Sequence, residues 1–330
     1  MNIAKFTSKR FLVPGLLLVL LILLAALPSY GHLLGMSIRE LFMPATSLMY
    51  VALAVSWTMF SGPTGYMSLA PAAFFGVGVY TTALLRETLP LTVIIAIGGA
   101  ISFAVALLVG QVTLRLKGIY FAIFTFGLVV LIGRLVLYYD IHIVGIRGRS
   151  VPPTSFEIFY YIMLAIAVVT LLTAYFIRRS KLGLALQSIG GNEEAAAHMG
   201  INTTMVKVIT FAISSMFMGA AGAAFATRMV FVDPTAAFSL NYSFIPVLMA
   251  IFGGMGQLYG PVIGAVVFSL LANWLSSEFP LYYGLIFGII LVVVILFLPG
   301  GIAGLVPKLQ KVGPIARLLN RGKEEQHANT

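Results

Sequence analysis

The most informative features of this sequence are what it lacks: it has no cysteine and few charged residues. Only 9% of its 330 residues are charged, whereas a soluble domain carries about a quarter. The mean hydropathy is high, at +1.03. Without cysteine the chain can have no disulfide, no thiolate metal site and no thiol nucleophile. The low charge excludes an ordinary soluble domain.

Ionisable groups are also missing from the apolar stretches. All 10 acidic residues and all 4 histidines fall in the polar segments between them. Carriers coupled to protons or sodium usually need a group that changes charge at membrane depth, so this placement argues against a secondary carrier. The chain also has no G-x-x-x-x-G-K-[ST] phosphate loop and no Ser/His/Asp or metal-ligand cluster. We therefore expect no catalytic residue, metal or cofactor in this chain, and energy for pumping would enter through another polypeptide.

Long apolar runs occupy most of the chain, and each is close to or longer than the roughly 20 residues that cross a bilayer. The runs are 11–28, 41–60, 66–85, 89–114, 118–138, 159–177, 208–227, 243–274 and 281–298. A closed β-barrel would instead show alternating segments of about ten residues. The sequence predicts an all-α polytopic membrane protein.

The net charge of +10 is distributed in a way that indicates topology rather than nucleic-acid binding. With the N-terminus inside, most of the basic residues fall in inner loops, as the positive-inside rule requires. Both termini are then cytoplasmic, so 243–298 must cross three times. Run 243–274 is therefore expected to be a helix pair broken near 253–256, which gives about ten transmembrane helices. Removal of 11–28 as a signal would leave nine, but this run is longer than a usual signal core of about 7–15 residues, so we expect it to be retained.

Two stretches interrupted by glycine and proline adjoin the apolar runs: SGPTGYMSLAPAAFFG (61–76) and FGGMGQLYGPVIGA (252–265). In a bilayer, non-helical backbone is tolerated only inside protein or along a water-filled cavity. One stretch in each half of the chain is typical of an internal repeat, with a path between two pseudo-symmetric halves. Tight turns at the inner surface are the alternative. The candidate pathway residues are Ser61, Gly62, Thr64, Gly65, Ser68, Gly253, Gly254 and Gly256.

A short acidic and alanine-rich stretch, SIGGNEEAAAHMG (188–200), lies in the longest polar gap of the middle of the chain. Asn192 is a good N-cap, and the helix dipole favours Glu193 and Glu194 in the first turn. Gly200 can end the helix in a left-handed conformation. A two-turn helix is too short to be stable alone, so it must pack against its own protein or a partner. We expect the face of Ala196 to be buried only against a partner.

These residues carry a resemblance. Glu194-Ala195-Ala196, followed three residues later by Gly200, resembles the E-A-A-x-x-x-G coupling motif of ABC-importer permeases. The setting resembles the branched-chain amino acid permease family more narrowly. The positions that match its longer pattern are Ser180, Gly183, Leu186, Ile189, Asn192, Glu193, Ala195, Ala196, Gly200 and Lys207. The stretches at 61–76 and 252–265 and the segment LRLKGIYFAIFTFG also resemble the family, in the expected order.

The resemblance implies a type II ABC-importer-like permease, paired with a sister permease. Two ABC ATPase subunits would bind ATP and Mg²⁺ and dock on the coupling residues Asn192, Glu193, Glu194, Ala195, Ala196 and Gly200, and an external binding protein would deliver the substrate. Three departures stand out: Gln187 and Gly190 occupy positions where the family commonly has arginine, Ala70-Pro71 replaces Gly-His, and the outer loop at 140–153 keeps only a trace of the family pattern.

We therefore expect one permease domain in the plasma (inner) membrane of a prokaryote, with N-terminal helices in 11–177, a cytoplasmic coupling loop at 178–207, C-terminal helices in 208–300 and a basic cytoplasmic tail at 301–330. The cargo would be a hydrophobic or branched-chain amino acid; urea, amides and small aromatic acids remain open. A passive channel for a small neutral solute such as urea is the alternative function. Arg147 and Arg149 cluster in an outer loop, where arginine is scarce, and are candidates for docking the binding protein, although solvated charges would look the same.

Overall fold

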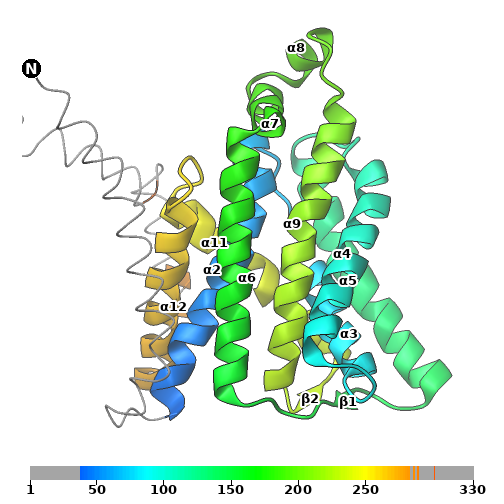
Figure 1. Cartoon of the computed structure of the whole chain (residues 1–330), viewed down its shortest axis with the longest axis vertical. Helices are drawn as coiled ribbons and strands as arrows, with labels where there is room; N and C mark the ends of the chain where they lie inside the picture. Colours follow the sequence, from blue (N-terminus) through cyan, green and yellow to red (C-terminus); the bar gives the residue numbers. More distant parts are fainter. Residues whose placement is uncertain (1–37, 283–284, 287, 290–300, 302–330) are drawn as a thin grey trace, which may run out of the picture.

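The computed structural model describes residues 38–282, 285–286, 288–289 and 301 (Figure 1). The expected span 11–28, most of 281–298 and nearly all of the tail 301–330 lie outside these residues. The helices are α2 (Ile38–Thr64), α3 (Pro71–Leu85), α4 (Leu91–Thr113), α5 (Ile119–Tyr138), α6 (Phe156–Arg179), α7 (Lys181–Gly191), α8 (Glu193–His198), α9 (Thr203–Phe225), α10 (Pro234–Ala237), α11 (Asn241–Gly253) and α12 (Gly260–Glu278). Short elements are the π-helical turn η1 (Tyr139–Val144), the 3₁₀ turn η2 (Ala226–Arg228) and the antiparallel strands β1 (Arg149–Ser150) and β2 (Phe231–Val232).

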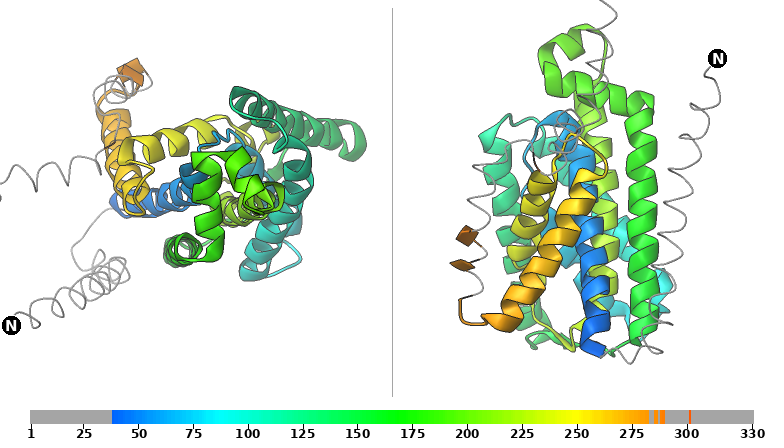
Figure 2. Two further views of the ribbon diagram at one scale, coloured as in Figure 1. Left: turned by 90° about the horizontal axis from the view of Figure 1, so that it is seen from above. Right: turned by 90° about the vertical axis from the view of Figure 1, so that its left-hand side faces the viewer.

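The long helices confirm an all-α polytopic membrane protein. Within the described residues, 7 helical segments are long and apolar enough to cross a membrane, and α3 is a shorter apolar helix. They run between two ends of the molecule (Figures 1 and 2). Helices α7 and α8 lie at one end, which we call the α8 end, and the two strands lie at the opposite end, which we call the strand end.

Close packing around α9 depends on glycines. A Cβ on Gly78 of α3 would lie 1.9 Å from the carbonyl oxygen of Gly219 in α9, and one on Gly222 would lie 2.0 Å from the carbonyl oxygen of Phe75. Lipid provides little hydrophobic drive for helix association, so such backbone contacts are how membrane helices gain packing energy. The small residues of 215–226 therefore form a helix-packing surface.

The expected break in run 243–274 is confirmed. Helix α11 ends at Gly253, Gly254 has a φ of +102°, and α12 begins at Gly260. A Cβ on Gly253 would lie 1.9 Å from the carbonyl oxygen of Gly260, so the two helices touch through their backbones at the turn. The run is a helix pair that turns back at the α8 end (Figure 1).

The expected span 66–85 is wrong at its start, because α3 begins only at Pro71 and residues 65–70 are not helical. Pro71 occupies the first turn of α3, where its missing N–H costs no helical hydrogen bond. The replacement of Gly-His by Ala70-Pro71 therefore gives a well-formed helix start. We call residues 65–70 the linker.

Candidate coupling site and pathway

Helix α8 has the termini that the sequence predicts. The side chain of Asn192 accepts a hydrogen bond from the backbone N–H of Ala195 at 3.0 Å, and Glu193 and Glu194 lie in the first turn. After His198 the chain turns at Gly200, whose φ is +87°. The N–H of Ile201 then donates to the carbonyl oxygen of Ala196 at 3.2 Å. Both ends are thus satisfied within the loop itself.

The expectation about Ala196 is wrong. Its side chain is only 3% exposed within this chain alone, so the protein's own residues already cover that face of α8. The exposed surface lies on the other sides of the helix. It consists of Glu194, Ala195, Ala197, His198, Met199 and Gly200. Met199 is 84% exposed, and Leu184 of the neighbouring α7 is 63% exposed, which leaves apolar groups open to a partner.

Helix α7 was not anticipated from the sequence. Ser180 caps it by accepting a hydrogen bond from the N–H of Gly183, and its buried residues Gly183, Leu186 and Ile189 recur every third position. A serine cap followed by this spacing is the sequence signal from which α7 could have been predicted. A Cβ on Gly190 would lie 2.1 Å from the carbonyl oxygen of Pro63, so α7 rests directly on the end of α2.

Glu193 anchors α8 in an ion-pair network. Its carboxylate accepts hydrogen bonds from Lys207 Nζ at 2.6 Å and from the Tyr66 hydroxyl at 2.5 Å. Burial by itself would raise the pKa of Glu193, but these hydrogen bonds and the charges of Lys207 and Lys117 outweigh it and hold the pKa below its ordinary value. The neighbouring Glu194 is 80% exposed at its side chain and faces Lys117 at 3.5 Å. The two adjacent glutamates therefore occupy different environments.

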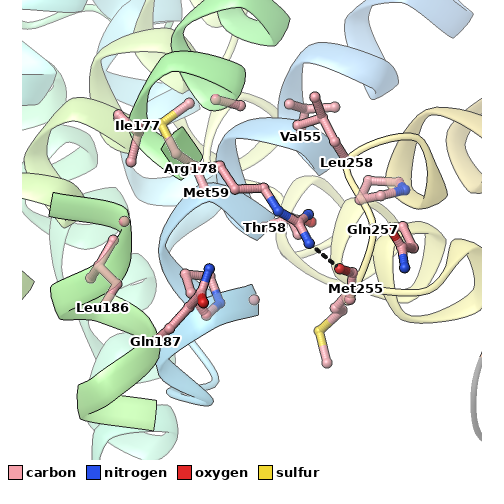
Figure 3. A pocket seen from close by; sticks show the side chains of 16 residues that line it. Val55, Thr58, Met59, Ile177, Arg178, Leu186, Gln187, Met255, Gln257 and Leu258 are labelled. Carbon is pink, nitrogen blue, oxygen red and sulfur yellow. Dashed lines mark hydrogen bonds between the residues drawn. The ribbon is translucent and has the colours of Figure 1, made fainter. Parts of the chain in front are cut away.

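A cavity of about 290 Å³ opens at the α8 end, between α2, α6, α7 and the α11–α12 turn. It brings the two glycine- and proline-interrupted stretches together, because Gly62 and Gly256 both line it. Figure 3 shows Arg178 reaching from α6 toward the α11–α12 turn, where its guanidinium donates to the carbonyl oxygen of Gly256. Gln187, which replaces the family's arginine, lies on the opposite wall.

The other six candidate pathway residues do not line this cavity. Gly253 is the last residue of α11, Gly254 begins the α11–α12 turn, and Gly65 begins the linker with a φ of +72°. Thr64 donates its hydroxyl to the carbonyl oxygen of Phe60, and Ser68 is buried within the linker. Ser61 is buried, and its hydroxyl has no hydrogen-bond partner among the described residues. The structure thus joins Gly62 to Gly256 at one cavity but does not bring all eight residues together.

At the strand end, Arg147 and Arg149 have partners within the chain. Arg147 Nε pairs with Asp233 at 2.9 Å, and Arg149 pairs with Asp140 at 3.5 Å. Asp140 lies in the polar segment that follows run 118–138, and it is fully buried in η1, which continues α5. The Tyr80 hydroxyl donates to Asp140 at 2.6 Å. These ion pairs give both arginines a structural role.

Within the described residues, no group of three or more histidine or acidic side chains is placed to hold a metal ion. The arrangement of long apolar helices, an interrupted span and a short capped helix at one end is that of a multi-pass membrane protein. Residues 41–295 match the family model described as a branched-chain amino acid transport system permease component. The chain belongs to this family of type II ABC importer permeases, and it is a multi-pass inner-membrane protein.

Several curated proteins are similar to this chain. The high-affinity branched-chain amino acid transport system permease protein LivM of Salmonella typhimurium is 26% identical over 291 residues, which covers 78% of this chain and 68% of LivM. The ribose import permease protein RbsC of Haemophilus influenzae is 31% identical over 117 residues, covering 34% of this chain and 36% of RbsC. The xylose transport system permease protein XylH of the same organism is 30% identical over 118 residues, covering 34% and 32%.

Proposed function

We propose that this permease moves a branched-chain or other hydrophobic amino acid inward. The observation that carries the proposal is the extent of the match to LivM, which reaches over 78% of this chain, whereas the ribose and xylose permeases match only about a third. The absence of charged side chains from most of the apolar runs fits a cargo without net charge. A sugar is the second candidate cargo, because the two sugar permeases are related over their matching segments.

In this proposal, two ABC ATPase subunits dock on the exposed surface of α8, which puts the α8 end in the cytoplasm. ATP and Mg²⁺ are bound by those subunits. Met199 and Leu184 offer apolar contact, and Glu194 and His198 offer polar contact. ATP-driven closure of the ATPases displaces α8, and the helices reorient around a pathway shared with a sister permease, giving alternating access.

An external binding protein delivers the substrate at the strand end. Arg147 remains a candidate for contact with it, since its side chain is 60% exposed despite the pair with Asp233. The side chain of Arg149 is only 21% exposed and is paired with Asp140, so it is the weaker candidate.

The test is uptake by the complete transporter in proteoliposomes, with leucine, isoleucine, valine, ribose, xylose and urea offered separately. We expect ATP-dependent uptake of the amino acids that requires the binding protein. Uptake of ribose or xylose but of no amino acid would contradict the proposed cargo and favour a sugar, the second candidate. Uptake of urea by the permease without ATPases would support the passive channel and contradict the proposal.

A further inference from the structure

Lys207 is a buried charged residue at the α8 end. Its side chain is only 2% exposed, although lysine is almost never fully buried unless paired. Its Nζ donates to Glu193 Oε1 at 2.6 Å, to the Tyr66 hydroxyl at 3.2 Å and to the carbonyl oxygen of Leu114 at 3.1 Å. It also lies 4.6 Å from the centre of the Tyr66 ring. One ammonium group therefore joins α8, the start of α9, the end of α4 and the linker.

Tyr66 carries this network into the interior of the bundle. Its ring packs edge-on against Phe121 at 5.5 Å between centroids, while its hydroxyl donates to Glu193. The rest of the linker, after Tyr66, is held by hydrogen bonds that involve side chains rather than by helical hydrogen bonds. Trp57 Nε1 donates to the carbonyl oxygen of Ser68 at 2.7 Å, and the N–H of Leu69 donates to the Thr125 hydroxyl at 2.9 Å.

The linker also contacts the second half of the chain. The Ser243 hydroxyl donates to the carbonyl oxygen of Leu69 at 2.8 Å and accepts from the N–H of Ala72 at 2.9 Å. Ser243 lies in the first turn of α11. Hydrogen bonds therefore connect the linker and the start of α3 to α2, α5 and α11.

We propose that Tyr66 and Lys207 are positioning residues that transmit the movement of α8 to the linker, and thereby to the interior of the permease. The inference rests on the proposed function, in which the ATPases act on α8. Hydrogen bonds to ionised groups are short and strong, and removing one partner of a buried ion pair is costly. Glu193, Lys207 and Tyr66 therefore move together, whereas Glu194, whose side chain is 80% exposed beside Lys117, is accessible to the ATPases.

The experiment uses the complete transporter in nanodiscs and follows the linker directly. Because this chain has no cysteine, a Met67→Cys reporter in the linker is the only thiol of this subunit, and its labelling is read on the separated permease band; Met67 is 42% exposed. We expect its labelling rate to differ about fivefold between the nucleotide-free and the ATP–vanadate-trapped complex, in the range of typical coupling effects. Tyr66→Phe keeps the packed ring but removes the hydroxyl, and should reduce the difference below about twofold while ATPase subunits are retained normally.

Tyr175→Phe is the matched control, because it removes a hydroxyl near the same end from the exposed side of α6 and should keep the full difference. The double variant Glu193→Gln/Lys207→Met removes both charges together, so neither is left buried and unpaired. It should also lose the difference. A labelling difference that survives in both network variants, or that is missing from the parent, overturns the proposal. Loss of the ATPases in Tyr66→Phe would also overturn it, because the network would then only shape the docking surface.

Discussion

Gly190 shows how one residue can explain a departure from a family pattern. The resemblance leads one to expect arginine there, yet even a Cβ would lie 2.1 Å from the carbonyl oxygen of Pro63. Backbone cannot yield as a flexible side chain would, so α7 approaches α2 this closely only with glycine. Gln187, three residues earlier, lines the cavity at the α8 end instead. At these two positions the chain therefore has a packing contact, made by Gly190, and a cavity-lining residue, Gln187, where the family commonly has arginine.

Gly190→Ala should therefore destabilise the permease, by about 1–3 kcal/mol, as overpacking of a tight contact does. The control is Gly191→Ala at the next position, where a Cβ would meet nothing within 4 Å and φ is not positive. Thermal unfolding of the purified permease in detergent measures both. Equal melting temperatures for the two variants would mean that α7 does not rest on α2 in this way.

At the scale of elements, the sequence is a good guide wherever the signal is local. The cap at Asn192, the turn at Gly200 and the break after Gly253 follow from residue types at fixed offsets, and all three are observed. The burial of Ala196 could not be predicted, because it depends on which face of α8 the rest of the chain covers. Likewise, the linker is held by Thr125 and Ser243, which are distant in sequence. The substrate pathway stays a prediction for the same reason.

The exposed and buried alanines of α8 allow a test of ATPase docking. Ala197→Arg places a bulky charge on the exposed face, so we expect normal permease levels but loss of co-purifying ATPase subunits. Ala196→Arg is the matched control on the covered face, where burying an arginine should lower the permease level itself. Immunoblots of membranes and co-purification separate the two effects. Full ATPase retention with Ala197→Arg would remove α8 as the docking element, whatever the result for the linker.

At the scale of the whole molecule, basic residues at both ends have partners within the chain. At the α8 end, Lys207 is paired in a buried network, Lys117 faces Glu194 across the surface and Arg178 holds the α11–α12 turn. At the strand end, Arg147 and Arg149 are both paired with aspartate. In the predicted topology the strand end is the outer face, where basic residues are scarce, and each of these two arginines is paired with an aspartate there.

The sidedness of the whole molecule is a prediction from the positive-inside rule and can be tested at both ends. Met199→Cys on α8 and Val230→Cys beside β2 change residues that are 84% and 70% exposed, and the chain has no other cysteine to label. We expect a membrane-impermeant maleimide to label residue 230 in intact cells and, when the permease is produced without its ATPase subunits, residue 199 only in inverted vesicles. The reason is that the inner loops hold most of the basic residues, and ATP for the partner subunits is available only in the cytoplasm. Labelling in the opposite pattern would put α8 on the outside and exclude it as a site for ATPases.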